Sequence, residues 1–148
     1  GPLVNGSGAV VGINAFIFSA SGGSQGLGFA IPVNVAKRVI NELIEFGRVR
    51  DVWLGVQVQE MSSVLARAIG REATNGVMVS FIEPGSPADR AGMESGDIVI
   101  GVNDAPVEGV RSARRAIFGS RVGDTITLEV DRRGSRRNFA IRLEEVPR

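Results

Sequence analysis

Residues 76–107 read GVMVSFIEPGSPADRAGMESGDIVIGVNDAPV, and this stretch decides the fold of the larger part of the chain. An apolar strand at 76–82 runs into the turn 83–87, where two prolines preset the backbone dihedral angles. One helical turn at 88–91 follows, and residues 96–103 then form a turn, a strand and a second turn. We expect the turn residues to shape the backbone rather than to touch a ligand.

The sequence around this stretch predicts further short elements of the same unit. The spacing of apolar residues favours strands at 53–59, 124–131 and 137–143, a short helix from Ser62 or Ser63 to Ala68, and a helix at 110–118. The last two strands close around Arg133 and Gly134. Several short strands with few helices fit a β-sandwich-like domain of about a hundred residues.

The first fifty residues have a different pattern. Residues 9–17 are apolar and β-branched, which predicts a strand buried on both faces, and a second strand at 27–31 ends at Pro32. Asn34 is placed to cap a helix that runs to Phe46, and Gly47 is a natural helix stop. Apolar periodicity breaks at residues 47–51, so we expect one domain over 1–47 and another over 48–148.

Composition narrows the chemistry that the chain can perform. The net charge is +1, which gives no reason to expect binding to nucleic acid or to an anionic membrane surface. Cysteine is absent, so disulfides and thiolate metal sites are excluded, and we expect no metal and no cofactor. No apolar run is long enough to cross a bilayer, which takes about 20 residues.

The stretch at 76–107 is similar to the PDZ domains of bacterial proteases, and the similarity extends over residues 52–148. Such domains bind a peptide as an added strand and hold its terminal carboxylate in a nest of backbone N–H groups. The resemblance implies that Arg114 lies at the rim of that groove and that Arg50 lends it positive charge. The alternatives are that Arg50 is a solvated linker residue and that Leu54, Val56 and Ile117 are core. The residues expected to bind peptide are Trp53, Leu54, Gly55, Val56, Val58, Ala113 and Ile117.

The segment Gly26-Leu27-Gly28-Phe29-Ala30-Ile31-Pro32 resembles a strand that lines the primary specificity pocket of high-temperature-requirement (HtrA) serine proteases. This family joins a trypsin-like domain to PDZ domains, in the order found here. The resemblance implies that Leu27, Gly28 and Phe29 hold substrate beside the scissile bond, and that residues 18–25 match an activation loop. A phosphate cradle is disfavoured, because no Lys-Ser/Thr follows the glycines. The fold class expected is mainly β with helices: the C-terminal segment of a trypsin-like β-barrel followed by a PDZ domain.

The opening Gly1-Pro2-Leu3-Val4 resembles the end of the motif around the nucleophile of trypsin-like proteases. By this alignment the serine precedes Gly1, and the chain contains no histidine that could serve as its base. We therefore expect no catalytic residue here and no proteolysis by the chain alone.

The resemblance also implies a role for the parent protein. It would be a serine endopeptidase of protein quality control in the bacterial cell envelope or periplasm, and its PDZ domain would read hydrophobic C-terminal or unfolded segments of substrates. The alternative is a non-catalytic PDZ module that regulates a protease. Unpaired strand edges in residues 1–33 would favour a homo-oligomer.

Overall fold

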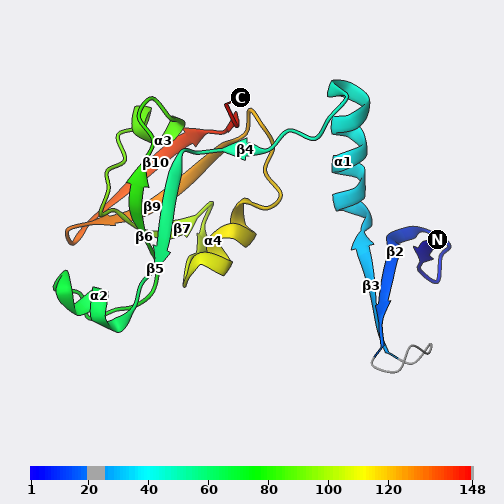
Figure 1. Cartoon of the computed structure of the whole chain (residues 1–148), viewed down its shortest axis with the longest axis horizontal. Coiled ribbons are helices and arrows are strands. Elements are labelled where there is room, and N and C mark those ends of the chain that lie inside the picture. Colours follow the sequence, from blue (N-terminus) through cyan, green and yellow to red (C-terminus); the bar gives the residue numbers. More distant parts are fainter. Residues whose placement is uncertain (20–25, 148) are drawn as a thin grey trace. The chain divides into compact units, whose positions relative to one another are not determined.

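The computed structural model describes residues 1–19 and 26–147, so most of the predicted activation loop at 18–25 lies outside the described residues. The chain forms two compact units, an N-terminal unit (Gly1–Val49) and a C-terminal unit (Arg50–Arg148). Both contain antiparallel strands and at least one helix (Figure 1). The predicted class, mainly β with helices, is confirmed.

The N-terminal unit is one antiparallel sheet and one helix. Its strands lie in the order β1-β2-β3. The helix ends at Gly47 as predicted, with a backbone φ of 70° and an N–H that donates to the carbonyl of Leu43 at 2.9 Å. The predicted cap at Asn34 is wrong, because the helix already begins after Pro32 and has no side-chain cap. The elements are β1 (Pro2–Val4), β2 (Val10–Phe18), β3 (Leu27–Pro32) and α1 (Val33–Phe46).

Strand β2 is not buried on both faces, which contradicts the sequence prediction. Gly12 is its only buried residue, while Phe16 and Ile17 are each 61% exposed. An apolar strand loses contact with water only where a second layer covers it. Among the described residues of this unit, the one helix leaves most of the sheet uncovered. Phe16 instead stacks on Phe29 of β3, with ring centroids 4.8 Å apart.

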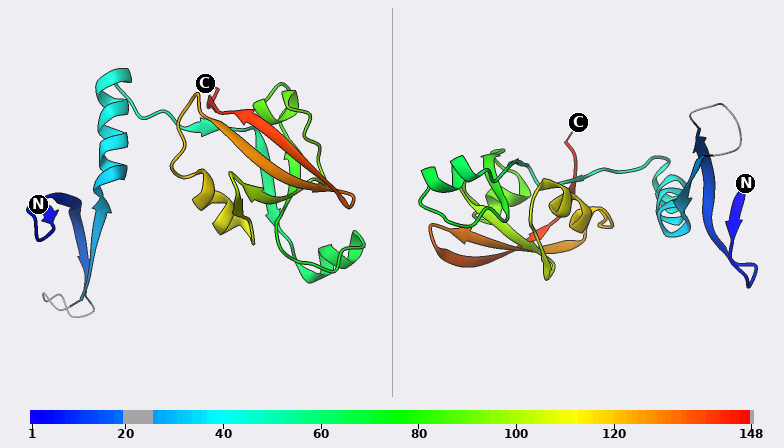
Figure 2. Two further views of the ribbon diagram at one scale, coloured as in Figure 1. Left: turned by 180° about the vertical axis from the view of Figure 1, so that it is seen from behind. Right: turned by 90° about the horizontal axis from the view of Figure 1, so that it is seen from below.

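The C-terminal unit is built around one larger sheet, in the order β10-β9-β7-β6-β5, with β8 beside β7 and a separate pair β11-β4 (Figure 2). The turn predicted at Arg133 and Gly134 joins β9 to β10. The strands are β4 (Val52–Trp53), β5 (Val56–Glu60), β6 (Val77–Ile82), β7 (Ile98–Val102), β8 (Ala105–Pro106), β9 (Thr125–Arg132), β10 (Ser135–Arg142) and β11 (Glu144–Glu145). The helices are α2 (Ser63–Ala68), α3 (Pro87–Arg90) and α4 (Val110–Ile117).

The core of this unit consists of branched aliphatic side chains from every long strand of the sheet except β5. On β9, alternate residues point inward, so that Ile126, Leu128 and Val130 are at most 3% exposed. One face of the sheet carries this cluster, and residues that alternate with it on the central strands join a second cluster in which Met61, Ala66 and Ile98 are buried. Other members of the first cluster are Val77, Val79, Val99, Val102, Ile141 and Leu143.

A buried ion pair joins the turn before β7 to the end of β9. Asp97 is 1% exposed, and its Oδ1 accepts from Arg132 Nε at 2.6 Å while its Oδ2 accepts from Nη2 at 2.8 Å. Asp97 Oδ2 also accepts the backbone N–H of Glu94 at 2.9 Å, so this aspartate satisfies a turn amide. The hydrogen bond to Asp97 raises the pKa of the Arg132 guanidinium. The pair therefore fixes the turn that precedes the central strand.

Candidate peptide-binding site

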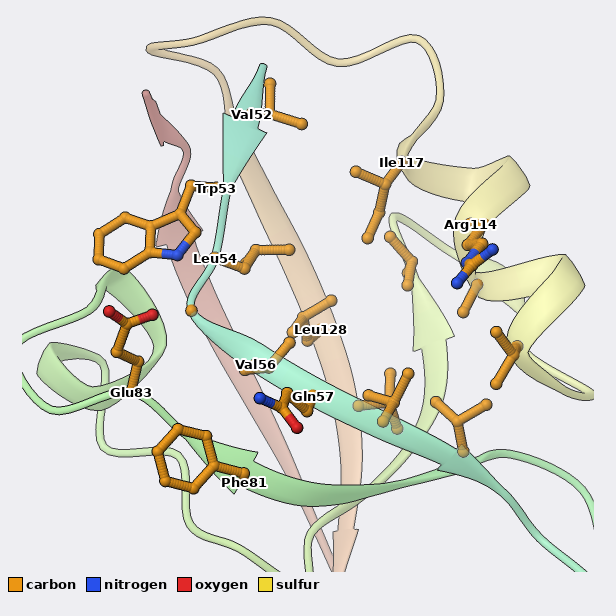
Figure 3. A pocket seen from close by; sticks show the side chains of 17 residues that line it. Val52, Trp53, Leu54, Val56, Gln57, Phe81, Glu83, Arg114, Ile117 and Leu128 are labelled. Atoms are coloured by element: carbon orange, nitrogen blue, oxygen red, sulfur yellow. The ribbon is translucent and has the colours of Figure 1, made fainter. Parts of the chain in front are cut away.

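A cavity of about 530 Å³ opens between β5 and α4 in the C-terminal unit (Figure 3). Its size is within the range of small-ligand sites, about 300–1,000 Å³. All seven residues that the sequence predicted for peptide binding line it. They come from the segment 53–58 on one side and from α4 on the other, so the structure brings together residues about sixty positions apart in the sequence.

The strand predicted at 53–59 is broken in the structure, and the break forms one end of the cavity. Leu54 and Gly55 lie between β4 and β5, and Gly55 has a φ of 76°. This is the left-handed region, which glycine adopts without steric cost. A Cβ atom at Gly55 would lie 2.1 Å from the Cβ of Ser86, so glycine is required here for a second reason.

The carbonyl groups of this loop are fixed, whereas its amides are available. The N–H of Ala88 donates to the Leu54 carbonyl at 3.1 Å, and the N–H of Glu83 donates to the Gly55 carbonyl at 2.8 Å. Within residues 1–19 and 26–147, no acceptor is found for the N–H groups of Leu54 and Gly55. Adjacent amides next to a left-handed residue form an anion-binding nest.

Apolar side chains line the cavity beside this nest. Leu54 and Val56 extend from the loop and from β5, and Ile117 faces them from α4 (Figure 3). These three side chains are half-buried and also pack against the core cluster. The two interpretations of the sequence, core and groove, are therefore compatible.

Helix α4 forms the facing wall and is fixed at its start. Val110, Ala113, Arg114 and Ile117 all line the cavity, at the spacing of one helix face. The N–H of Val110 donates to Glu60 Oε1, at the end of β5, at 2.9 Å. This bond ties the wall to the strand across the groove. Arg114 is exposed at the rim.

Several lining residues were not predicted from the sequence. Val110 precedes Ala113 by three positions, so its place on the same helix face could have been deduced. Phe81 on β6 and Glu83 after β6 belong to the cavity because of strand pairing, which single-strand patterns do not reveal, whereas Gln57 lies on the strand that the sequence predicted to pair with the peptide. Arg50, considered as a charge donor, does not line this cavity.

The three residues predicted to hold substrate in the N-terminal unit lie on β3. Leu27 is 67% exposed and Phe29 is 47% exposed. Gly28 and Phe29 line a shallow hollow that also includes Leu3 and Asn14. Their role in substrate binding stays a prediction.

In the part of the chain that the structure describes, no helix is both long and apolar enough to span a membrane. No three histidine, cysteine, aspartate or glutamate side chains there are grouped as ligands of one metal ion.

Residues 52–143 match the family model described as PDZ domain. The chain is also similar to proteins named as probable periplasmic serine endoproteases, DegP-like. The one from Rhizobium meliloti is 40% identical over 147 residues, and the one from Bartonella henselae is 39% identical. The match covers 99% of this chain but only 29% of either relative. These names support the periplasmic location predicted from the sequence.

Solved structures give the same relationship. The HtrA-type protease AlgW, solved with a decapeptide, is 35% identical with a TM-score of 0.71, and the match covers 99% of this chain and 45% of that chain. The PDZ domain of HtrA3, solved with the phage-derived ligand FGRWV, is 26% identical with a TM-score of 0.57 and covers 65% of this chain. The predicted resemblance to HtrA-type proteases is confirmed.

Proposed function

Because this chain belongs to the PDZ domain family through residues 52–143, we propose that its groove binds the apolar C-terminus of an extended peptide. The observation that carries the proposal is the pair of amides at Leu54 and Gly55, which have no acceptor among the described residues and lie at the end of an apolar cavity. The terminal carboxylate would occupy this nest, and the last side chain would enter between Leu54, Val56 and Ile117.

The rest of the peptide would pair with β5. This strand is last in the order of its sheet, so one of its edges is open to an added strand. The peptide would lie antiparallel to β5, between Val58 and α4, with Ala113 opposite. The HtrA3 ligand FGRWV ends in valine, which supports an apolar last residue.

The chain spans less than a third of the curated relatives that it matches, so the activity of the whole protein is a proposal. The N-terminal unit supports a parent that is an HtrA-like serine endopeptidase of envelope protein quality control. In that parent, Leu27, Gly28 and Phe29 would contact substrate, and the nucleophile and its base would come from other residues. A PDZ module that regulates a separate protease is the second candidate, and the match of residues 1–49 to protease sequence disfavours it.

The binding proposal is tested with a labelled peptide that ends in valine, compared in its free-acid and amidated forms. Hydrogen bonds to a charged group contribute about 1.5–3 kcal/mol, so amidation is expected to weaken binding about tenfold or more. Fluorescence anisotropy measures both dissociation constants. Equal affinity for the two forms would refute the carboxylate nest.

Two matched glycine variants locate the site. Gly55→Ala should abolish binding, because its Cβ would displace Ser86 and its φ of 76° disfavours alanine. Gly134→Ala has a similar φ of 84° with no atom within 4 Å of the added Cβ, so it controls for backbone strain alone. Both variants are checked by circular dichroism. Retained binding in a folded Gly55→Ala variant would place the site elsewhere.

The expectation that the chain alone does not cleave proteins is tested with an unfolded substrate such as casein. The chain alone is expected to give no cleavage, since it has no histidine to activate a serine. Cleavage products on a denaturing gel, at a rate proportional to the concentration of the chain, would contradict this.

A further inference from the structure

A second surface adjoins the groove, on the side of β5 away from α4. It consists of Trp53, Gln57, Phe81 and Glu83, which we call the outer face (Figure 3). Gln57 and Phe81 are register partners in the β5–β6 pair, so their side chains lie on the same side of the sheet. Phe81 is 46% exposed, so its ring is accessible to a peptide side chain on this face.

Strand alternation determines which part of a peptide meets this surface. If the last side chain enters the groove between Leu54, Val56 and Ile117, the penultimate side chain must point to the opposite side. There it lies across from Gln57, on the same face as Phe81. The distance from the added strand to β6 is two strand spacings, about 10 Å. A long penultimate side chain is therefore needed to reach Phe81 and Glu83.

The charge of the outer face comes from Glu83. Neighbouring acidic side chains already have partners: Glu144, opposite Trp53 in the β4–β11 pair, bonds to Arg90, and Asp89 accepts the N–H of Gly85 at 2.7 Å. Within the described part of the chain, no hydrogen bond or ion pair is formed by the Glu83 carboxylate. Its backbone N–H is held by Gly55, so its position beside the nest is fixed.

We propose that the outer face selects peptides with a basic penultimate residue, arginine above lysine. A cation there would pair with the Glu83 carboxylate and lie over the rings of Phe81 and Trp53. Arginine fits better, because its planar guanidinium can stack on a ring while donating to a carboxylate. Arg114 would not repel a basic penultimate side chain, since it lies at the rim formed by α4, on the other side of the added strand. This inference rests on the proposed function of the groove.

The test uses four free-acid peptides that end in valine and differ only in the penultimate residue: arginine, alanine, glutamate or phenylalanine. An exposed ion pair with a cation–π contact predicts that the arginine peptide binds about fivefold more tightly than the alanine peptide. The glutamate peptide should bind more weakly than alanine. The arginine preference should shrink in 1 M salt, where charges are screened beyond about 3 Å.

Two charge-matched variants separate the outer face from long-range electrostatics. Glu83→Gln should reduce the arginine preference, measured as the ratio of the affinities for the arginine and alanine peptides, to at most twofold. Glu72→Gln removes the same charge from an exposed residue that does not line the cavity, so it should keep the preference. If Glu83 only supported the loop, Glu83→Gln would weaken all peptides together and leave the arginine preference unchanged, which would overturn the proposal.

The outcomes distinguish this inference from the proposed function. If no free-acid peptide binds more tightly than its amide, the groove proposal fails. If free acids are preferred but arginine is no better than alanine, or phenylalanine is preferred over arginine, only the choice of a basic residue is overturned.

Discussion

The N-terminal and C-terminal units contain strands of similar apolar character, but only the second unit buries them. Phe16 and Ile17 on β2 are each 61% exposed, whereas Ile126 on β9 is 1% exposed and Val130 is fully buried. The difference lies outside the strands. In the C-terminal unit, α4 packs against one core cluster of the sheet and α2 against a second, whereas the described residues of the N-terminal unit provide a single helix.

Extended backbone and burial are two separate properties, although both are often inferred from an apolar sequence. β-branched runs select extended backbone locally, because their side chains fit a pleated surface. Burial depends on a second layer, which the strand itself does not encode. The exposed apolar side chains of β2 and β3 therefore predict a covering surface supplied from elsewhere, either another part of a longer protein or a second copy of the chain.

Equivalent truncations in the two units should give the largest difference. Ile126→Ala is expected to reduce the free energy of unfolding by about 4 kcal/mol, because it leaves a cavity in a closed core. Ile17→Ala should change it by less than about 0.5 kcal/mol, since the side chain is already in water. Urea titration followed by far-UV circular dichroism covers both units, and the fluorescence of Trp53, the only tryptophan, reports on the C-terminal unit alone. Similar losses in both variants would mean that β2 is covered in solution.

Much of this fold follows from local signals in the sequence. The prolines around Ser86 and the glycine at position 134 require particular turns, and both turns formed where they were predicted. The helix at α1 followed from its periodicity and from Gly47. What could not be predicted is long-range. The ion pair between Asp97 and Arg132 joins residues 35 positions apart, and nothing in either local sequence indicates the partner.

In the candidate site, too, local signals in the sequence identify some residues, and long-range strand pairing adds others. Trp53, Leu54, Gly55 and Val56 were identified through the resemblance to PDZ domains, because a glycine between apolar residues at the start of a strand fits the nest that such domains use. The break of the predicted strand at Gly55 was not expected, because alternation of residues continues across it. The outer face was also missed. Phe81 approaches Gln57 only through strand pairing, and the register of a pair depends on both strands.

The buried ion pair between Asp97 and Arg132 should stabilise the C-terminal unit more than an ion pair on its surface does. Arg132→Met is expected to cost about 3 kcal/mol, because the carboxylate of Asp97, 1% exposed, loses its cationic partner. Arg136→Met breaks a pair with Glu129 that is exposed, with Arg136 77% accessible, and should cost less than about 1 kcal/mol. Both values come from urea titration monitored by Trp53 fluorescence. Equal costs would show that burial of the Asp97 pair contributes nothing to the closed core.

Helix capping gives the smallest expected difference between the units. The Ser62 hydroxyl accepts the N–H of Leu65 at 3.1 Å and caps α2, so Ser62→Ala should destabilise the C-terminal unit by about 1 kcal/mol. In the N-terminal unit, α1 begins after Pro32 without a side-chain cap, and Asn34 lies inside its first turn, where its Oδ1 accepts the N–H of Val35. Asn34→Ala should therefore leave stability unchanged or raise it slightly, since alanine is the better helix former. Thermal unfolding by circular dichroism, with the single variants and the double variant compared, measures both effects. A loss near 1 kcal/mol for Asn34→Ala would restore the cap that the sequence predicted and would mean that α1 begins about two residues later in solution.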